Sequence, residues 1–384
     1  MEDSLEVCPR TEYFLEALKQ LPDTRDNRGK RHSLIFIIAA VVFAILVGRS
    51  MTSSIHRYIE NKIDWLRKVT GIMNAKPISR SHLPRLLNQI NWYALNELIQ
   101  EYFNLYILPK TATSEWIAID GKVLKGTLKG GDKQAIIHAV THETRSEVEQ
   151  ARQSGKKSSE IPVVRNLLKE SGLEAKKITL DAHHCNPETT AQIASAKGTY
   201  LTQVKKNQPI LLKQCEAVEK GEIALFAQEN HEKAHGRLTS RSSCIFSMKN
   251  IPLDKRWETS CLQTLVIIKR ETLTLKTGKK SEDTSYYISN RAVDKDQAER
   301  ANDLVGAVRK HWGVESNNWI LDVTFNEDNV IIKEKNQAHI MGRLRGFALQ
   351  LLRKAGIQNF QAALENFTDL PDSMEAFLRQ VKFL

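Results

Sequence analysis

The stretch WIAIDGKVLKGT at residues 116–127 decides the class of fold, because its short apolar run ends in the pair Asp-Gly at 120 and 121. A second apolar run, at 177–180, leads directly into Asp181 in the same way. Groups that follow the strands of an open α/β sheet line its functional crevice. Both aspartates are therefore candidates for a functional site.

Segments on either side of these runs extend the pattern. Two further apolar runs, at 135–140 and 200–204, have the length and residue types of strands. Between them lies SSEIPVVRNLLKESGL at 158–173, which predicts a helix capped by Ser158 or Ser159 and ended by Gly172. Alternating strands and helices predict an α/β domain.

The residues before 110 follow a different pattern of apolar positions, and this pattern predicts helices only. Its apolar periodic stretches are Thr11–Leu21, Ser33–Gly48, Ser54–Thr70 and Tyr93–Tyr106. Ser33 is expected to cap the second helix and Gly48 to end it, and Pro77 and Pro84 to mark a break. The run LIFIIAAVVFAILV at 34–47 is shorter than the roughly 20 residues that cross a bilayer. It predicts a buried helix and no membrane span.

After residue 235 the pattern of apolar residues changes twice more. Residues 236–290 contain alternating β-type segments, which predict an extension of the sheet. Residues 294–316 and 335–354 return to helical periodicity.

The overall charge is basic. Lys and Arg outnumber Asp and Glu by 56 to 45, a net charge of +11, which favours a polyanionic partner. Five cysteines without a C-x-x-C pair argue against a disulfide framework and fit a reducing compartment. The first residues, MEDSLEVCPR, lack the apolar segment of a secretory signal. We therefore expect a cytoplasmic, nucleoid-associated protein.

Three acids are candidates for holding divalent metal: Asp120, Asp181 and Glu315. Carboxylates from separate elements can share Mg²⁺ or Mn²⁺, and two such ions about 4 Å apart assist both oxygens of a phosphodiester displacement. Each acid alone has an ordinary alternative, because Asp-Gly is a common turn and a helical Glu commonly faces water. Rival ligands near the third acid are Asp322, Glu327 and Asp328.

Seven segments occur in an order that resembles the H-repeat-associated transposases, a branch of the DDE insertion-sequence superfamily. They are WIAIDGKVLKGT (116–127), KKSSEIPVVRNLL (156–168), ITLDAHHCN (178–186), KGTYLTQVKKNQPIL (197–211), AHGRLTSR (234–241), YYIS (286–289) and HWGVESNNWILDVTFNED (311–328). The stretches DTRDNRGKRHSL (23–34) and NQAHIMGRLRGFALQLL (336–352) also fit the family. The similarity covers nearly the whole chain.

The resemblance implies an RNase H-like catalytic domain at 111–384, with a β-rich insertion at about 212–292, preceded by a helical domain at 1–110. It implies that Asp120 and Asp181 lie on strands, that Glu315 lies on a helix, and that Mg²⁺ or Mn²⁺ is the cofactor. The implied activity is cleavage and strand transfer of double-stranded DNA at the ends of an insertion sequence, by a homodimer assembled on DNA. The alternatives are a degenerate relative that only binds DNA and a hydrolytic nuclease that joins no strands.

Further residues are weighed as DNA contacts against the alternative of ordinary solvated or turn residues. They are Lys122, Lys125, Lys205, Lys206, Asn207, His235, Arg237 and His311. Trp312 and Trp319 could stack on a flipped base, although core packing is the stronger expectation. Adjacent His183, His184 and Cys185 do not predict zinc, because neighbours on one segment rarely supply a tetrahedral site.

The sequence departs from the family pattern around the third acid. Relatives show E-N-x-L-H-W, whereas Glu315 is followed by a segment that is one residue shorter and has no His before Trp319. Several other insertion-sequence transposases carry Arg four residues before the acid, where this chain has His311.

Overall fold

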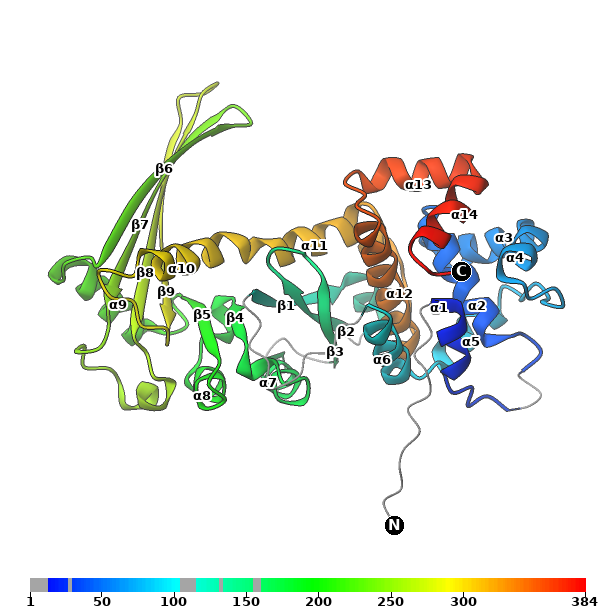
Figure 1. Cartoon of the computed structure of the whole chain (residues 1–384), viewed down its shortest axis with the longest axis horizontal. Helices are drawn as coiled ribbons and strands as arrows, with labels where there is room; N and C mark the ends of the chain where they lie inside the picture. The colour runs from blue at the N-terminus through cyan, green and yellow to red at the C-terminus, as the bar shows by residue number, and fades with distance from the viewer. Residues whose placement is uncertain (1–12, 27–29, 104–114, 131–133, 155–159) are drawn as a thin grey trace, which may run out of the picture.

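The computed structural model describes residues 13–26, 30–103, 115–130, 134–154 and 160–384. The described residues form one nine-stranded mixed sheet with helices on both faces. The sheet occupies one end and the middle of the elongated molecule, and most of the N-terminal and C-terminal helices gather at the other end (Figure 1). The predicted mixed α/β class is confirmed.

The strand order across the sheet is β3-β2-β1-β4-β5-β9-β8-β7-β6. The bounds are β1 Trp116–Leu124, β2 Gln134–Thr141, β3 Glu147–Ser154, β4 Lys177–Leu180, β5 Thr199–Val204, β6 Phe226–Ala234, β7 Arg237–Ser247, β8 Thr264–Thr274 and β9 Lys280–Ser289. β1 pairs antiparallel with β2 and parallel with β4, and β4 pairs parallel with β5. Four of these strands match predicted runs, whereas the polar segment EVEQARQS that forms β3 was not predicted.

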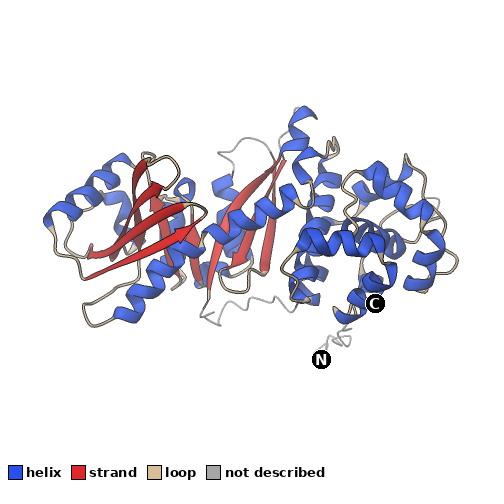
Figure 2. Ribbon diagram, turned by 90° about the horizontal axis from the view of Figure 1, so that it is seen from above, coloured by secondary structure: helices blue, strands red, loops and turns tan. Residues whose placement is uncertain are grey.

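Strand β1 has two different faces because side chains alternate along it. Ile117 and Ile119 join a core that includes α7 (Glu160–Glu170), α8 (Pro187–Ser195) and α9 (Pro209–Gly221). Ala118 instead contacts Val314 of α11 (Trp312–Val323), which follows α10 (Ala298–Lys310) on the opposite face (Figure 2). Asp120 follows Ala118 by two residues and therefore faces α11.

The expected sheet extension is present as β6 to β9, whose hairpins project beyond the rest of the molecule (Figure 1). The β6–β7 turn consists of His235 and Gly236, with φ of 48° and 70°. Two positive φ values in a two-residue loop match the twist of the flanking strands. The hairpin tip is thus a tight turn with exposed side chains.

The four predicted N-terminal helical stretches are present over their described residues, as α1 Phe14–Ala17, α2 Leu34–Leu46, α3 Thr52–Asn61 with α4 Ile63–Thr70, and α6 Trp92–Tyr102. A further helix, α5 His82–Gln89, was not predicted, and the expected break at Pro84 is wrong because Pro84 lies in the first turn of this helix, where proline is tolerated. Ser33 caps α2 by accepting a hydrogen bond from the Phe36 amide at 3.3 Å, and Gly48, with φ of 74°, follows its end. All of α2 except Ile35 is buried. None of the described helices combines the length and apolar character that crossing a membrane requires.

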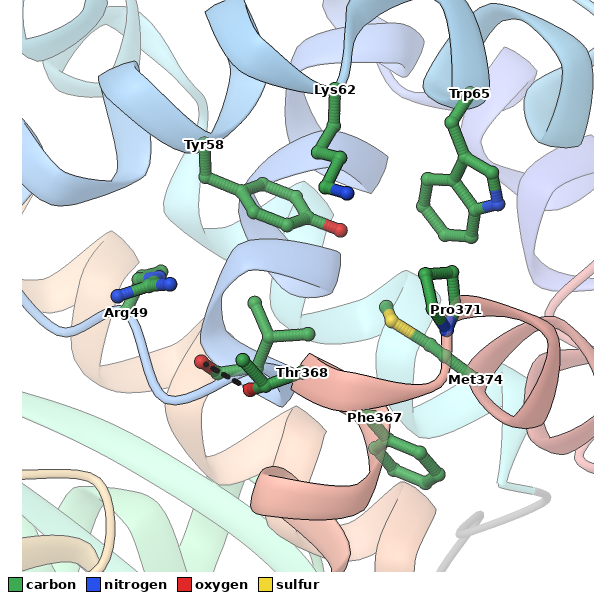
Figure 3. A pocket seen from close by; sticks show the side chains of 9 residues that line it. Arg49, Tyr58, Lys62, Trp65, Phe367, Thr368, Pro371 and Met374 are labelled. Carbon is green, nitrogen blue, oxygen red and sulfur yellow. Dashed lines mark hydrogen bonds between the residues drawn. The ribbon is translucent and has the colours of Figure 1, made fainter.

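The C-terminal helices pack against these N-terminal helices. They are α12 Lys335–Lys354, α13 Phe360–Asp369 and α14 Pro371–Gln380. Phe14 contacts Phe347 and Phe383, and Thr368 donates to the Val47 carbonyl at 3.3 Å beside a small pocket (Figure 3). The division into domains at 1–110 and 111–384 stays a prediction. None of the candidate acids lines that pocket.

Short 3₁₀ helices complete the described chain. They are η1 Leu18–Gln20, η3 Lys125–Gly130, η5 Leu173–Ala175, η6 Ala182–His184, η7 Lys255–Ser260 and η8 Glu327–Asn329. The helix predicted after residue 158 is α7, followed by Gly172 with φ of 71°. Its expected caps, Ser158 and Ser159, lie outside the described residues.

Candidate active site

The two aspartates come from neighbouring parallel strands. Ile119 of β1 is paired with Leu180 of β4, so Asp120 and Asp181 each follow a member of this pair. Asp181 caps η6, with one carboxylate oxygen accepting from the amides of His183 at 2.9 Å and His184 at 3.2 Å. Strand β4 ends before Asp181, whereas β1 continues past Asp120 to Leu124 because β2 pairs along its whole length. Asp120 therefore lies inside a strand and not in the turn that Asp-Gly suggested.

Glu315 lies in the first turn of α11, directly over this part of the sheet. Asn318, one turn further along α11, donates from Nδ2 to Oδ2 of Asp120 at 3.1 Å. This bond joins the helix of the third acid to the strand of the first. The segment that is shorter than in the family is helical throughout, since α11 continues without a break from Trp312 to Val323.

The acids influence one another's ionisation. Burial, together with the nearby charges of Asp181, Glu160 and Glu315, raises the pKa of Asp120 to about 6. Burial likewise raises the pKa of Glu315, while Lys205 opposes the rise and Asp181 adds to it. Carboxylates that share a site without enough compensating cations show this behaviour.

The chemistry of these side chains suits a hard divalent cation, but their geometry is not that of a formed metal site. Carboxylate oxygens are the ligands that Mg²⁺ and Mn²⁺ prefer. Across the described ranges, however, no three His, Cys, Asp or Glu side chains converge closely enough to hold a metal ion as they stand. Glu315 is exposed and is the member with the most freedom to move. The three-carboxylate metal set is therefore a proposal.

A further acid that the sequence analysis did not single out lies in the same place. Glu160 begins α7 and is only 6% exposed. Its Oε1 lies 3.1 Å from Nε2 of His184, in the turn that Asp181 caps. The segment KKSSEIPVVRNLL was part of the family resemblance, but nothing in one sequence indicated which of its residues would meet the aspartates.

Lys122 does not have the role predicted for it. Its ammonium is buried and lies 2.5 Å from Asp322, 2.8 Å from Glu327 and 3.5 Å from Asp328. A buried ammonium that is held by carboxylates is not available to a DNA phosphate, so the predicted contact is wrong for this residue. Asp322, Glu327 and Asp328, the rival candidates for holding metal, therefore bind the ammonium of Lys122 instead.

Two other predicted DNA contacts take part in the architecture. His311 lies between α10 and α11, and its Nδ1 is 2.9 Å from the Thr179 hydroxyl. Burial lowers the pKa of His311 to about 4, so the ring is neutral near pH 7 and brings no positive charge to the predicted DNA contact. Asn207 donates to the Ala182 carbonyl at 2.6 Å and thereby holds the turn beside Asp181.

The remaining predicted DNA contacts are exposed. Lys205 and Lys206 follow β5 beside the acids, and His235 and Arg237 lie at the β6–β7 tip. Lys125 is also exposed, although it forms an ion pair with Asp328 at 2.5 Å. DNA contact stays a prediction for all five of these exposed residues.

The expectation of core packing for the two tryptophans of α11 is wrong. Trp312 is 57% exposed and Trp319 is 61% exposed. They lie one turn before and one turn after Glu315, on the outward side of α11. Large exposed aromatic side chains of this kind mark interaction surfaces.

Comparison with known proteins identifies the family of the chain. The family described as "Transposase DDE domain" matches residues 112–351, and the one described as "DDE_Tnp_1-associated" matches residues 15–103. "Putative transposase YncI" of Escherichia coli O157:H7 is 28% identical over 357 residues, which are 88% of this chain and 87% of that protein. "H repeat-associated putative transposase YhhI" of Escherichia coli K12 is 26% identical over 361 residues, which are 90% and 93% of the two chains. The chain therefore belongs to the DDE transposase family.

Proposed function

We propose that this chain is a DNA transposase that holds Mg²⁺ or Mn²⁺ with Asp120, Asp181 and Glu315. The observation that supports the proposal is the placement of the three elements: Asp120 and Asp181 follow paired residues of parallel strands, and the helix of Glu315 hydrogen-bonds to Asp120 through Asn318. An RNase H-like core is part of the proposal. The order β3-β2-β1-β4-β5, followed by the β6–β9 extension and the helix of the third acid, supports it.

The proposed reaction has two displacements at phosphorus. Water attacks a phosphodiester at the element end, and the departing 3′ oxygen becomes a free hydroxyl. That hydroxyl then attacks a phosphodiester of the target DNA, and a target 3′ oxygen leaves. Bound metal supplies charge stabilisation at the phosphate oxygens and a lower pKa for the attacking water. The carboxylates hold the cations, and closing the centre requires Glu315 to turn toward the aspartates.

The DNA is proposed to lie along the exposed side of α11. A phosphate held near Glu315 brings the neighbouring nucleotides against Trp312 and Trp319, whose rings can stack on unpaired bases. Lys205 and Lys206 supply positive charge beside the acids, and His235 and Arg237 extend this surface along the projecting hairpin. Two element ends have to be brought together, so we propose that two copies of the chain assemble on DNA.

The test is an assay on DNA that carries the element ends, with Mg²⁺ or Mn²⁺ and a target plasmid. Asp120→Asn, Asp181→Asn and Glu315→Gln are each expected to lose cleavage and joining by at least about 10³-fold, which corresponds to several kcal/mol of lost stabilisation. Cleavage without joined products would identify a nuclease. Wild-type activity in any of the three variants would remove that acid from the proposal.

Two observations favour a second candidate, a degenerate relative that binds DNA without cutting it. The described side chains form no ready metal-binding group, and the segment after Glu315 departs from the family pattern. Specific binding to the element ends, with no metal-dependent cleavage by the wild-type chain, would establish this candidate.

A further inference from the structure

Two side chains that contact the sheet bracket Glu315 along its helix. His311 precedes Glu315 by four residues and Asn318 follows it by three, so the three lie on the same side of the helix. Asn318 donates to the carboxylate of Asp120 at 3.1 Å. None of the described residues forms a hydrogen bond or an ion pair with the side chain of Glu315 itself. The position of Glu315 therefore follows from the anchoring of its helix.

His311 attaches the start of this helix to β4. Its Nδ1 lies 2.9 Å from the hydroxyl of Thr179, which is only 2% exposed. Thr179 lies on β4 two residues before Asp181, and the backbone of Asp181 is extended, so both side chains point to the same side of the sheet. The start of α11 is thus fixed to the strand that leads to the second acid.

A second histidine fixes the hydroxyl of Thr179 from the other side. Nε2 of His142, which directly follows β2, lies 2.9 Å from the same oxygen, and His142 is buried. A hydroxyl can donate its hydrogen to one ring and accept a hydrogen bond from the other. The Ile117 carbonyl is more distant, at 3.5 Å. Because Thr179 is held in this way, it offers His311 a fixed partner.

We infer that His311 is a positioning residue, whose hydrogen bond to Thr179 sets the first turn of α11 and thereby the distance from Glu315 to Asp181. This inference rests on the proposed function, because it assigns a role at the same site. A displacement of about 1 Å at a reacting centre can cost about 100-fold in rate. The helix stays in place, and only the side chain of Glu315 has to turn toward the aspartates.

The first experiment measures amide hydrogen exchange in the full chain without DNA, by mass spectrometry. Thr179→Val and His311→Leu remove the hydrogen bond and should raise the exchange rate of peptides covering 311–316 about 10-fold. His311→Asn should exchange like the wild type, because its amide group places a polar atom where the ring has Nδ1. A loss of stability of the whole fold would instead raise exchange in all helices.

Thr190→Val is the matched control for Thr179→Val. Thr190 is also fully buried, and its hydroxyl lies 2.8 Å from that of Ser260, which joins α8 to η7 away from α11. This variant should leave exchange at 311–316 unchanged. If His311→Leu does not fold, His311→Gln takes its place, because its amide lies one carbon further from the backbone than Nδ1.

The second experiment uses the cleavage assay on DNA that carries the element ends. Thr179→Val and His311→Leu should lower the rate at saturating DNA about 10- to 100-fold and leave the affinity for DNA unchanged. His311→Asn should restore most of the rate. The double variant should be no slower than the slower single variant, because both changes remove the same contact.

The outcomes separate this inference from the proposed function. Faster exchange limited to α11, together with slower cleavage at unchanged DNA affinity, supports the inference. Wild-type exchange in both Thr179→Val and His311→Leu overturns it, as does weaker DNA binding by His311→Leu with an unchanged rate at saturation. If the wild-type chain cuts no DNA, the proposed function fails, and the exchange rates alone decide whether the hydrogen bond holds α11.

Discussion

Two groups of carboxylates lie along β1, two residues apart, and they differ in how their charge is balanced. At Lys122, the carboxylates of Asp322, Glu327 and Asp328 surround a cation of the chain itself. At Asp120, the neighbouring acids are Asp181, Glu160 and Glu315. No lysine or arginine in the described parts of the chain forms an ion pair with Asp120, Asp181 or Glu315.

The difference shows which acidic group is suited to an external cation. Carboxylates already neutralised by a buried lysine gain little from a metal ion, because binding it would require displacing the lysine. The acids around Asp120 gain most from an added cation, because burial and the neighbouring carboxylates together raise the pKa of Asp120 to about 6. The first group therefore stabilises the fold, and the second is the candidate centre.

The largest expected effect comes from removing the internal cation. Lys122→Met should lower the free energy of unfolding by about 3–5 kcal/mol, because it leaves buried carboxylates without a partner. Urea titration followed by circular dichroism measures the loss. Lys125→Met is the matched control and should cost at most about 1 kcal/mol, since its ion pair is exposed. A stable Lys122→Met protein with weakened DNA binding would contradict the structural role.

The second effect concerns Asp120 and its neighbouring acids in the metal-free chain, where no lysine or arginine among the described residues balances their charge. The pKa of Asp120 is about 6 in the folded state against a usual value of 3.8, so the folded state binds the proton more tightly. Stability should therefore fall as pH rises from about 4 to 6, by up to about 3 kcal/mol, and stay lower above pH 6. Asp120→Asn should remove this decline and be more stable than the wild type at pH 7.

Asp303 is the control for this pH dependence, because its pKa is shifted in the opposite direction. Hydrogen bonds from Lys177 and Trp116 lower the pKa of Asp303 despite its partial burial. Its contribution to stability should be present above about pH 4 and lost on further acidification. Urea unfolding across pH in the presence of a chelator measures both residues. Identical pH profiles for Asp120→Asn and the wild type would mean that the acids are not mutually repulsive.

The third effect tests the exposed side of α11. Trp312→Ala and Trp319→Ala should each weaken DNA binding by about 1–3 kcal/mol, or about 10- to 100-fold, through lost stacking. Their melting temperatures should change little because both rings are exposed. Fluorescence anisotropy with end-containing DNA measures the affinity, and Ile223→Ala, another exposed apolar residue, is the control. Unchanged DNA affinity together with a lost dimer would assign the tryptophans to contact between two copies.

The smallest effect belongs to the exposed lysines beside the acids. Lys205→Ala and Lys206→Ala should each reduce the dependence of log affinity on log salt by about one unit, as expected for a lost phosphate contact. Lys220→Ala, an exposed lysine on α9, should leave the slope unchanged. Equal slopes in all these proteins would remove Lys205 and Lys206 from the DNA surface.

Local signals in the sequence predicted much of the fold. Ser33 and Gly48 bound α2 because capping and left-handed backbone are local properties. Strand β3 was missed because its buried polar side chains are stabilised by contacts with distant parts of the chain. Glu147, for example, lies 3.3 Å from Arg343 of α12.

The candidate site was predictable only where the acids follow apolar runs. The positions of Asp120 and Asp181 came from that pattern, and Glu315 came from the family resemblance. The burial of Lys122, the contact of Glu160 with Gly121 and the exposure of Trp312 all depend on which elements meet in three dimensions. A single sequence carries no signal for such pairings.

The most direct test is a crystal structure of the full chain soaked in Mn²⁺, with the metal located from its anomalous scattering. The account predicts a peak within about 2.5 Å of carboxylate oxygens from Asp120 and Asp181, with Glu315 turned inward. A peak only among Asp322, Glu327 and Asp328, or Glu315 still directed to solvent beside an occupied site, would contradict it.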